Sequence, residues 1–387
     1  MRLFLFLLAL LAPLVPLHAQ TRLAPDAEAQ WVPFELTRGN QIRFTMTLNG
    51  HAARAVLDTG VSDSIVSARF ATQAGLKPGA ATRAQAIGGV VDVRWATTDK
   101  LVIGGLTREG GRIGIADLDP VTIGGGATLD LLIGNDLLSC CAVEIDFDAK
   151  RFRLLHSGRL PFRGATMPLA RVPRLRAYAS EARLGERAVR PLIVDTGDGS
   201  MLTLSHAAWQ AAGARPSATT STMAFGAGGP IETELAVLPE VRLGTLTARD
   251  IEVRIEDGEG FSTRTGTAGR IGTGLLQRYH VLIDPGAKRM VLAPGAKAET
   301  PPVRSTSGLL LGYQNNELRV LHVMRNSPAA EGGWKAGELI CTIDGVPVPR
   351  GAGADIDAEW TVGTPGRVVR LGLCDGTERA LMLRRFY

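Results

Sequence analysis

Five residues, VLDTG at positions 56–60, decide the fold because they return as IVDTG at positions 193–197. Four further segments repeat in the same order and at nearly the same displacement. They are AGLKP at 74–78 and AGARP at 212–216, IGGLT at 103–107 and LGTLT at 243–247, LIGNDLL at 132–138 and RIGTGLL at 270–276, and IDFDAKR at 145–151 and IDPGAKR at 283–289. One match would mean little, but five matches in order indicate a duplicated domain.

The repeat divides the chain of 387 residues into parts that fit two or three domains. The first copy extends over residues 31–155 and the second over residues 167–293. Residues 294–306 are rich in Pro, Gly, Ser and Thr, and we interpret them as a linker. Residues 307–387 are enough for one more small domain.

Strand patterns dominate both copies. Residues 42–48 alternate apolar and polar side chains and end at Asn49-Gly50, a strong hairpin-turn signal. We therefore predict a mainly β fold. The family resemblances given below imply that the two copies are pseudo-symmetric β-barrel lobes and that the C-terminal segment is a small α+β domain.

Each copy is also expected to contain two short helices. The first begins at a Ser that can cap it and ends at a Gly, from Ser67 to Gly75 in one copy and from Ser205 to Gly213 in the other. The second follows each Ile-Gly pair, through residues 137–138 and 275–276.

The N-terminal residues are typical of an export signal. Arg2 precedes an apolar run at residues 3–17, and Ala19 offers a small residue for cleavage. The alternative is a membrane anchor, but the run is short and Pro13 and Pro16 interrupt it. We interpret residues 1–19 as a signal peptide and expect a periplasmic or secreted bacterial protein without a membrane span in its mature chain.

The amount and distribution of charge disfavour one class of partner, the nucleic acids. The chain has 43 Lys and Arg against 38 Asp and Glu, a net charge of +5, and a pI of about 9.2. These basic residues are spread along the chain without a dense stretch that alternates with aromatics, so we expect no nucleic-acid partner.

The chain has four cysteines. Cys140 and Cys141 are neighbours, which rarely bond to each other, so we predict two small buried thiols. Cys341 and Cys374 could form a disulfide in an exported protein. Their spacing fits no metal site, and we expect no metal and no cofactor.

The two Asp-Thr-Gly turns carry the chemistry. A carboxylate at the end of a buried strand is costly unless it is used or paired, and Gly lets the backbone turn sharply beside it. The repeat would bring Asp58 and Asp195 together, where two close carboxylates share one proton. One could then act as a base on water while the other donates a proton. The alternative is that each Asp-Thr-Gly is an ordinary structural turn.

These residues resemble the retropepsin-like aspartic peptidases over about residues 31–293. The resemblance implies that Asp58 and Asp195 are catalytic, supported by Thr59, Gly60, Thr196 and Gly197. It implies that residues 132–134 and 270–272 pass behind the aspartate loops. It also places flaps over an extended polypeptide substrate, at Ile87, Gly88, Gly89, Phe225 and Gly226.

Three residues depart from the family pattern. Val61 and Asp198 stand where a small or hydroxyl residue is usual, and Arg270 replaces an apolar residue. Val61 offers the aspartate pair no hydrogen bond, and Asp198 would add a nearby negative charge. We therefore expect cleavage to peak in weak acid, on the order of pH 5–6.

The C-terminal segment resembles a bacterial PDZ domain over most of residues 305–387. The resemblance rests on SPAA at 327–330, AGELI at 336–340 and IDG at 343–345. It implies a peptide-binding loop made of Gly308, Leu309, Leu310 and Leu311, whose N–H groups would capture the C-terminus of a peptide. The alternative is a packing module that binds no peptide.

We predict a monomeric, single-chain aspartic endopeptidase. The residue patterns of serine hydrolases, zinc peptidases and dinucleotide-binding folds are not found in the chain. Two rival hypotheses remain open. One is a catalytically silent peptide-binding or scaffolding protein of the cell envelope, and the other is an envelope protein that uses only its C-terminal domain.

Overall fold

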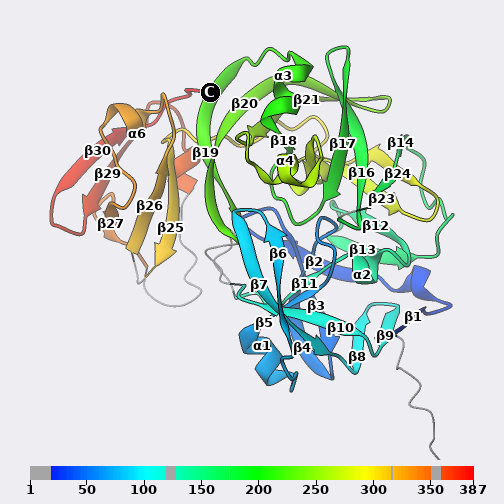
Figure 1. Cartoon of the computed structure of the whole chain (residues 1–387). Helices are drawn as coiled ribbons and strands as arrows, with labels where there is room; N and C mark the ends of the chain where they lie inside the picture. Colours follow the sequence, from blue (N-terminus) through cyan, green and yellow to red (C-terminus); the bar gives the residue numbers. More distant parts are fainter. Residues whose placement is uncertain (1–18, 119–127, 174, 315–316, 350–358) are drawn as a thin grey trace, which may run out of the picture.

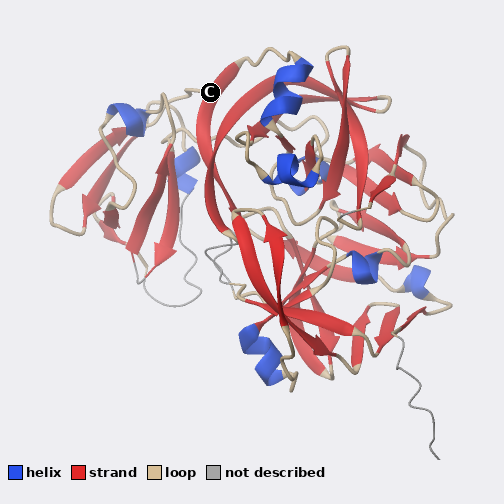
Figure 2. Ribbon diagram, in the orientation of Figure 1, coloured by secondary structure: helices blue, strands red, loops and turns tan. Residues whose placement is uncertain are grey.

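The computed structural model describes residues 19–387, except 119–127, 174, 315–316 and 350–358. Residues 1–18 of the predicted signal peptide lie outside the described residues. Strands make up 50% of the structure and helices 11%, which confirms a mainly β fold (Figure 2). Within the described residues, no helix has the length and apolar character needed to cross a membrane.

Lobe 1 follows a short N-terminal segment that contains β1 (Gln20–Leu23) and η1 (Ala27–Ala29). Its elements are β2 (Val32–Leu36), β3 (Ile42–Leu48), β4 (His51–Leu57), β5 (Ile65–Ser67), α1 (Ala68–Gln73), β6 (Ala81–Ala86), β7 (Gly89–Thr97), β8 (Lys100–Ile103), β9 (Leu106–Glu109), β10 (Arg112–Ala116), β11 (Leu131–Ile133), α2 (Asn135–Leu138), β12 (Ala142–Asp146) and β13 (Arg151–Leu155).

Lobe 2 repeats much of this order. Its elements are β14 (Ala165–Pro168), β15 (Ala170–Val172), β16 (Ala177–Leu184), β17 (Arg187–Asp195), β18 (Leu202–Leu204), α3 (His206–Ala212), β19 (Ala218–Gly226), β20 (Gly229–Leu243), β21 (Leu246–Ile255), α4 (Phe261–Thr265), β22 (Gly269–Gly272), α5 (Thr273–Leu276), β23 (Tyr279–Asp284) and β24 (Arg289–Pro294).

The predicted helices form for the expected local reasons. Ser67 Oγ accepts a hydrogen bond from the N–H of Phe70 at the start of α1, and Ser205 Oγ accepts one from Ala208 at the start of α3. Gly213 ends α3 with a left-handed φ of +59°. The second helix of each copy is α2 or α5, as predicted, whereas α4 was not anticipated.

The two lobes share one β-sheet between them. Strands β12 and β23 pair antiparallel, with Val143 opposite Ile283, and β13 and β24 continue the sheet on either side. Buried apolar residues of both lobes form one continuous core cluster. The two halves of the repeat therefore pack as one unit, which positions their Asp-Thr-Gly turns relative to each other.

The C-terminal domain has its own sheet and its own core cluster. Its elements are β25 (Leu309–Gln314), β26 (Glu317–Val323), α6 (Pro328–Glu331), β27 (Leu339–Ile343), β28 (Val346–Pro347), η2 (Glu359–Val362), β29 (Val368–Leu373) and β30 (Glu378–Met382).

The C-terminal domain docks on strand β19 of lobe 2 (Figure 1). Ser221 Oγ lies 2.8 Å from His322 Nε2 and accepts a hydrogen bond from the N–H of Arg325. Thr220 Oγ1 donates to the carbonyl of Arg325 at 2.6 Å. Strand β19 thus contacts the C-terminal domain and also pairs with β20 in a hairpin.

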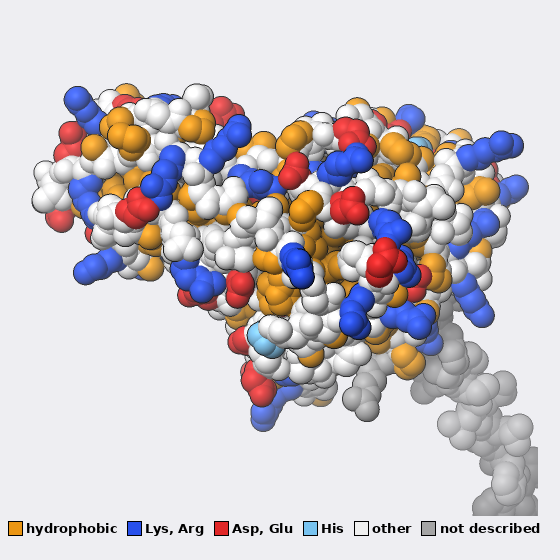
Figure 3. Space-filling view, turned by 90° about the horizontal axis from the view of Figure 1, so that it is seen from above, with side chains coloured by type: hydrophobic (Ala, Val, Ile, Leu, Met, Phe, Trp, Pro, Cys, Tyr) orange, Lys and Arg blue, Asp and Glu red, His pale blue; other side chains and the backbone are white. Residues whose placement is uncertain are grey.

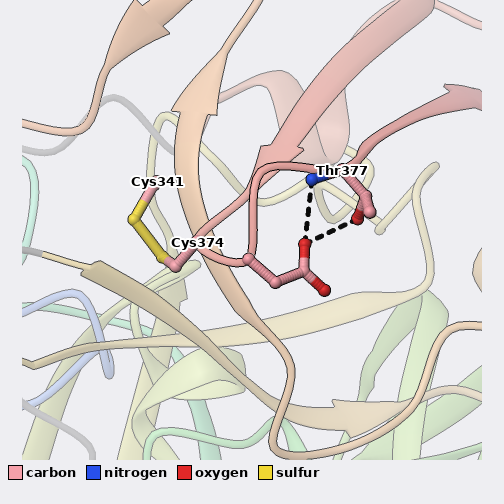
Figure 4. Close-up of a disulfide and its surroundings, with 4 residues drawn as sticks. Cys341, Cys374 and Thr377 are labelled. Atoms are coloured by element: carbon pink, nitrogen blue, oxygen red, sulfur yellow. Dashed lines mark hydrogen bonds between the residues drawn. A yellow bond between two sulfur atoms is a disulfide. The ribbon is translucent and has the colours of Figure 1, made fainter.

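Both cysteine pairs are bonded in the structure. Cys341 and Cys374 form a disulfide between β27 and the turn after β29 (Figure 4). The prediction of two buried thiols at Cys140 and Cys141 is wrong, since these neighbours form a disulfide as well. Burial of both side chains was also wrongly predicted, because the turn after α2 leaves Cys140 exposed and only Cys141 enters the core.

Charged side chains of both signs are dispersed over the face shown in Figure 3. In the view of Figure 3, Lys and Arg side chains alternate with Asp and Glu side chains on both the lobes and the C-terminal domain. This distribution agrees with the spread of basic residues along the sequence.

Candidate active site

Asp58 and Asp195 lie on two loops that face each other at the junction of the lobes. Asp58 directly follows β4, and Asp195 is the last residue of β17. A Cβ atom at Gly60 would collide with the carboxyl group of Asp195, and one at Gly197 would collide with that of Asp58. The two carboxyl groups are therefore close, and only glycine leaves room for this approach.

Each aspartate is held by the same pair of backbone hydrogen bonds. Asp58 Oδ1 accepts from the N–H groups of Gly60 at 3.0 Å and Val61 at 3.1 Å. Asp195 Oδ1 accepts from Gly197 at 3.0 Å and Asp198 at 3.1 Å. The expectation that Val61 gives no hydrogen bond is thus wrong for its backbone, although its side chain gives none.

The two threonines interlock beneath the aspartates. Thr59 Oγ1 accepts the N–H of Thr196 at 3.1 Å and donates to the carbonyl of Val194 at 2.6 Å. Thr196 Oγ1 accepts the N–H of Thr59 at 3.0 Å and donates to the carbonyl of Leu57 at 2.7 Å. Both side chains are buried, so four hydrogen bonds cross from one lobe to the other without competition from water.

The Ile-Gly segments support these loops from behind. Strand β11 runs parallel to β4, and β22 runs parallel to β17. Just after them, Asn135 Nδ2 donates to the carbonyl of Thr59 at 2.7 Å, and Thr273 Oγ1 donates to that of Thr196 at 2.9 Å. Equivalent positions of the repeat therefore fix equivalent carbonyl groups.

Burial and mutual repulsion change the acidity of the pair. Burial raises the pKa of Asp58 from 3.8 to about 6, against the hydrogen bonds from Gly60 and Val61. The pKa of Asp195 is raised well above its usual value by burial and by the charges of Asp58 and Asp198. The neighbouring Asp195 side chain also acts on Asp58 and lowers its pKa in part. Together these effects favour a pair that holds one proton in weak acid.

Two hairpins close over the aspartates. One is formed by β6 and β7 and the other by β19 and β20, and their tips meet where Gly228 N–H donates to the carbonyl of Ile87 at 2.9 Å. Below the tips lies a cleft of about 160 Å³. It is lined by Gln41, Asp58, Gly60, Val61, Ser62, Gln85, Ala86, Ile87, Leu132, Leu175, Asp195, Gly197, Asp198, Phe225, Gly226, Ala227 and Phe261.

The predicted site residues fall into two groups. The aspartates, their glycines and threonines, and the flap residues come together around this cleft, with Gly88 packed against the opposite hairpin tip at residues 228–229. Gly308 and Leu309 lie in the C-terminal domain instead. Their N–H groups already donate to the hydroxyl groups of Ser305 at 2.9 Å and Ser307 at 3.1 Å.

Sequence reasoning missed the partners of Arg270. The Arg270 side chain is buried, and its Nε lies 3.0 Å from Asp198 Oδ2 while its NH1 lies 2.8 Å from Glu256 Oε1. Arg254 approaches the other oxygen of Asp198 at 3.8 Å. The sequence shows that Asp198 and Arg270 are unusual at their positions. No motif around Glu256 or Arg254 predicts that these two residues also reach the site.

A larger cavity of about 490 Å³ lies on the other side of the Asp198 turn, between lobe 2 and residues 297–303. Neither aspartate lines it, so the smaller cleft is the better candidate for the active site. Among described residues, the only acid and thiol cluster with the spacing for a metal combines Glu317 with Cys341 and Cys374. Those two sulfur atoms are bonded to each other and are not thiolates.

Comparison with protein families agrees with the repeat. The family model described as Aspartyl protease matches the chain twice, over residues 44–137 and 180–276. The chain thus contains two tandem aspartyl protease-like regions, each with one Asp-Thr-Gly turn and one Ile-Gly segment. A comparison with curated proteins gave no match.

Proposed function

We propose that this protein is an aspartic-type endopeptidase whose catalytic residues are Asp58 and Asp195. The observation that carries the proposal is the pair of carboxyl groups that face each other across the Thr59–Thr196 interlock. Such a pair requires two lobes in a fixed relation, and the shared sheet and core supply that relation within one chain.

The mechanism uses the proton that the pair shares. The ionised carboxylate takes a proton from a water molecule, whose oxygen attacks the carbonyl carbon of the peptide bond. The protonated carboxyl group donates its proton to the carbonyl oxygen, and a tetrahedral intermediate results. When this collapses, the C–N bond breaks and the leaving nitrogen takes a proton from the protonated carboxyl group. One hydroxyl group of the intermediate gives its proton to the other carboxylate as the new C=O bond forms, so the pair holds one proton again.

The substrate class follows from the shape of the cleft. The cleft runs between the aspartates and two hairpins that meet above them, so an entering chain must be extended and the hairpins must open. Its lining includes Ile87, Leu132 and Phe225, which favours apolar side chains near the cleaved bond. We therefore propose unfolded or flexible polypeptides as substrates.

The test is cleavage of an unstructured protein by the full-length chain, from about pH 3 to 8, with Asp58→Asn as the matched control. Cleavage that peaks in weak acid and disappears in the variant supports the proposal. A wild-type chain that binds the polypeptide but never cleaves it would instead support the silent peptide-binding protein. Cleavage that survives in Asp58→Asn would place the catalysis elsewhere.

We further propose that the C-terminal domain is PDZ-like and recruits protein substrates. Its described strands follow the order β25-β26-β27-β29-β30, which places β25 at an edge where an added peptide strand can pair. Because the N–H groups of Gly308 and Leu309 already have partners, pairing along β25 is better supported than capture of a peptide carboxylate.

We propose export to the periplasm or the medium on the basis of the N-terminal sequence. The two disulfides support an oxidising compartment. The mass of the mature protein tests this, because cleavage after Ala19 leaves Gln20 as the first residue. A mature chain that retains residues 1–19 would favour an anchor instead.

A further inference from the structure

Among the residues that the structure describes, four charged side chains form an ionic cluster beside Asp195, and no equivalent cluster lies beside Asp58. We define this ionic cluster as Asp198, Arg254, Glu256 and Arg270. Arg270 Nε lies 3.7 Å from Asp195 Oδ2, in addition to its closer contacts with Asp198 and Glu256. Asp198 also accepts hydrogen bonds from Ser200 N–H at 2.9 Å and Thr203 Oγ1 at 3.1 Å.

The repeat shows what stands at the same positions beside Asp58. Leu132 pairs with Val56 just as Arg270 pairs with Ile193, so Leu132 and Arg270 are equivalent. The other equivalent pairs, taken from strand registers and the Asp-Thr-Gly alignment, are Val61 and Asp198, Gly114 and Arg254, Ala116 and Glu256, and Ile65 and Thr203.

Every position of the ionic cluster is therefore apolar or glycine in lobe 1. Leu132 and Ile65 pack there in a small apolar cluster with Val56, Leu118 and Leu129. The fold evidently accepts apolar side chains at these places. A buried ion pair is often no more stabilising than such a cluster, so stability alone does not account for the charges in lobe 2.

The positions of the charges suggest their effect. An opposite charge within about 4–6 Å favours the ionised form of a carboxyl group, and a like charge disfavours it. Arg270 and Asp198 thus act on Asp195 in opposite directions, as the causes of its shifted pKa also indicate. Glu256 holds the far side of the Arg270 guanidinium, and Arg254 approaches Asp198 from β21.

We propose that Arg270 is a positioning residue of the peptidase site, and that Arg270 and Asp198 together set the pH range over which the aspartate pair holds one proton. The inference rests on the proposed function. Asp198 moves this range to higher pH and Arg270 moves it to lower pH, so the loss of either charge should shift the range in a defined direction.

The experiment measures kcat/KM against pH for the full-length chain and four variants. Arg270→Met should move both limbs of the profile to higher pH by roughly one unit, because Asp195 loses the cation and keeps Asp198. Asp198→Asn should move both limbs to lower pH. Arg270→Lys keeps the charge and should stay near the wild type. The double variant Asp198→Val with Arg270→Leu copies lobe 1 and should lie between the two single variants.

A matched control separates this role from a structural one. Arg278 is also buried, but its guanidinium donates to the carbonyl groups of Arg249 and Thr300 and not to the aspartate pair. Arg278→Met should lower stability without moving the limbs. If Arg270→Met does not fold, Asp198→Asn still decides the question, because its limbs should lie at lower pH than those of the wild type and of the double variant.

Limbs that stay in place in Asp198→Asn would overturn the proposal. The ¹³C carboxyl shift of Asp195, titrated in the same variants and assigned with Asp195→Asn, gives a second readout that needs no turnover. If the wild type cleaves nothing but this titration moves as expected, the proposed function fails while the electrostatic role stands. If cleavage occurs and the titration is unmoved, only the inference fails.

Discussion

The threonine interlock gives the most direct prediction about stability. In Thr59→Val the side chain keeps its shape but loses its hydroxyl, which accepts the N–H of Thr196 and donates to the carbonyl of Val194. Two buried backbone groups are then unsatisfied, and each costs about 1–3 kcal/mol. We expect the free energy of unfolding of the paired lobes to fall by roughly 4 kcal/mol.

The matched control is Thr59→Ser, which keeps the hydroxyl and removes one methyl group. That loss should cost only about 1 kcal/mol. Urea unfolding followed by tryptophan fluorescence measures both variants, and Thr196→Val should behave like Thr59→Val because the interlock is symmetric. The double valine variant should cost less than the sum, since both threonines belong to one network. Equal midpoints for Thr59→Val and Thr59→Ser would refute the reasoning.

Three further predictions concern the catalytic unit and the C-terminal domain. Asp58→Asn and Asp195→Asn should each abolish cleavage of the unstructured protein without unfolding the chain. A mixture of the two variants should remain inactive, and recovery of cleavage on mixing would show that aspartate pairs form between chains. Truncation after Pro294 should spare the turnover of short peptides and weaken that of proteins, whereas loss of both would make the C-terminal domain part of the active lobes. Replacing Cys341 and Cys374 by Ala should lower the stability of the C-terminal domain by about 4 kcal/mol, from the closure of a loop of 33 residues; free thiols at both positions in the exported protein would contradict this bond.

The sequence predicted the features that depend on local signals. The Ser caps of α1 and α3, the strand at residues 42–48 and the second helices at α2 and α5 all follow from short patterns of capping, alternation and glycine. The facing of Asp58 and Asp195 was also foreseeable, because the repeat implied two equivalent turns related by pseudo-symmetry.

Features that depend on distant segments were not predictable. Glu256 and Arg254 reach the site because β21 runs parallel to β18, about fifty positions away in sequence, with Arg254 opposite Thr203. Neither residue is unusual in its own segment. The bond between Cys140 and Cys141 was not predictable for another reason. Adjacent cysteines rarely bond to each other, and no local pattern in the sequence marks the exceptions.

The ionic cluster can lie beside one aspartate alone because the two lobes are parts of one chain and can differ in sequence. In a symmetric homodimer every substitution occurs on both sides of the axis, so a charge beside one aspartate is matched by the same charge beside the other. A duplicated chain is free of this constraint. Here Asp198 and Arg270 occupy one lobe while Val61 and Leu132 occupy the other. The two carboxyl groups therefore have the same pattern of backbone hydrogen bonds and threonine support but differ in their electrostatic surroundings. Under the proposed function, this difference distinguishes the two members of a pair that shares one proton.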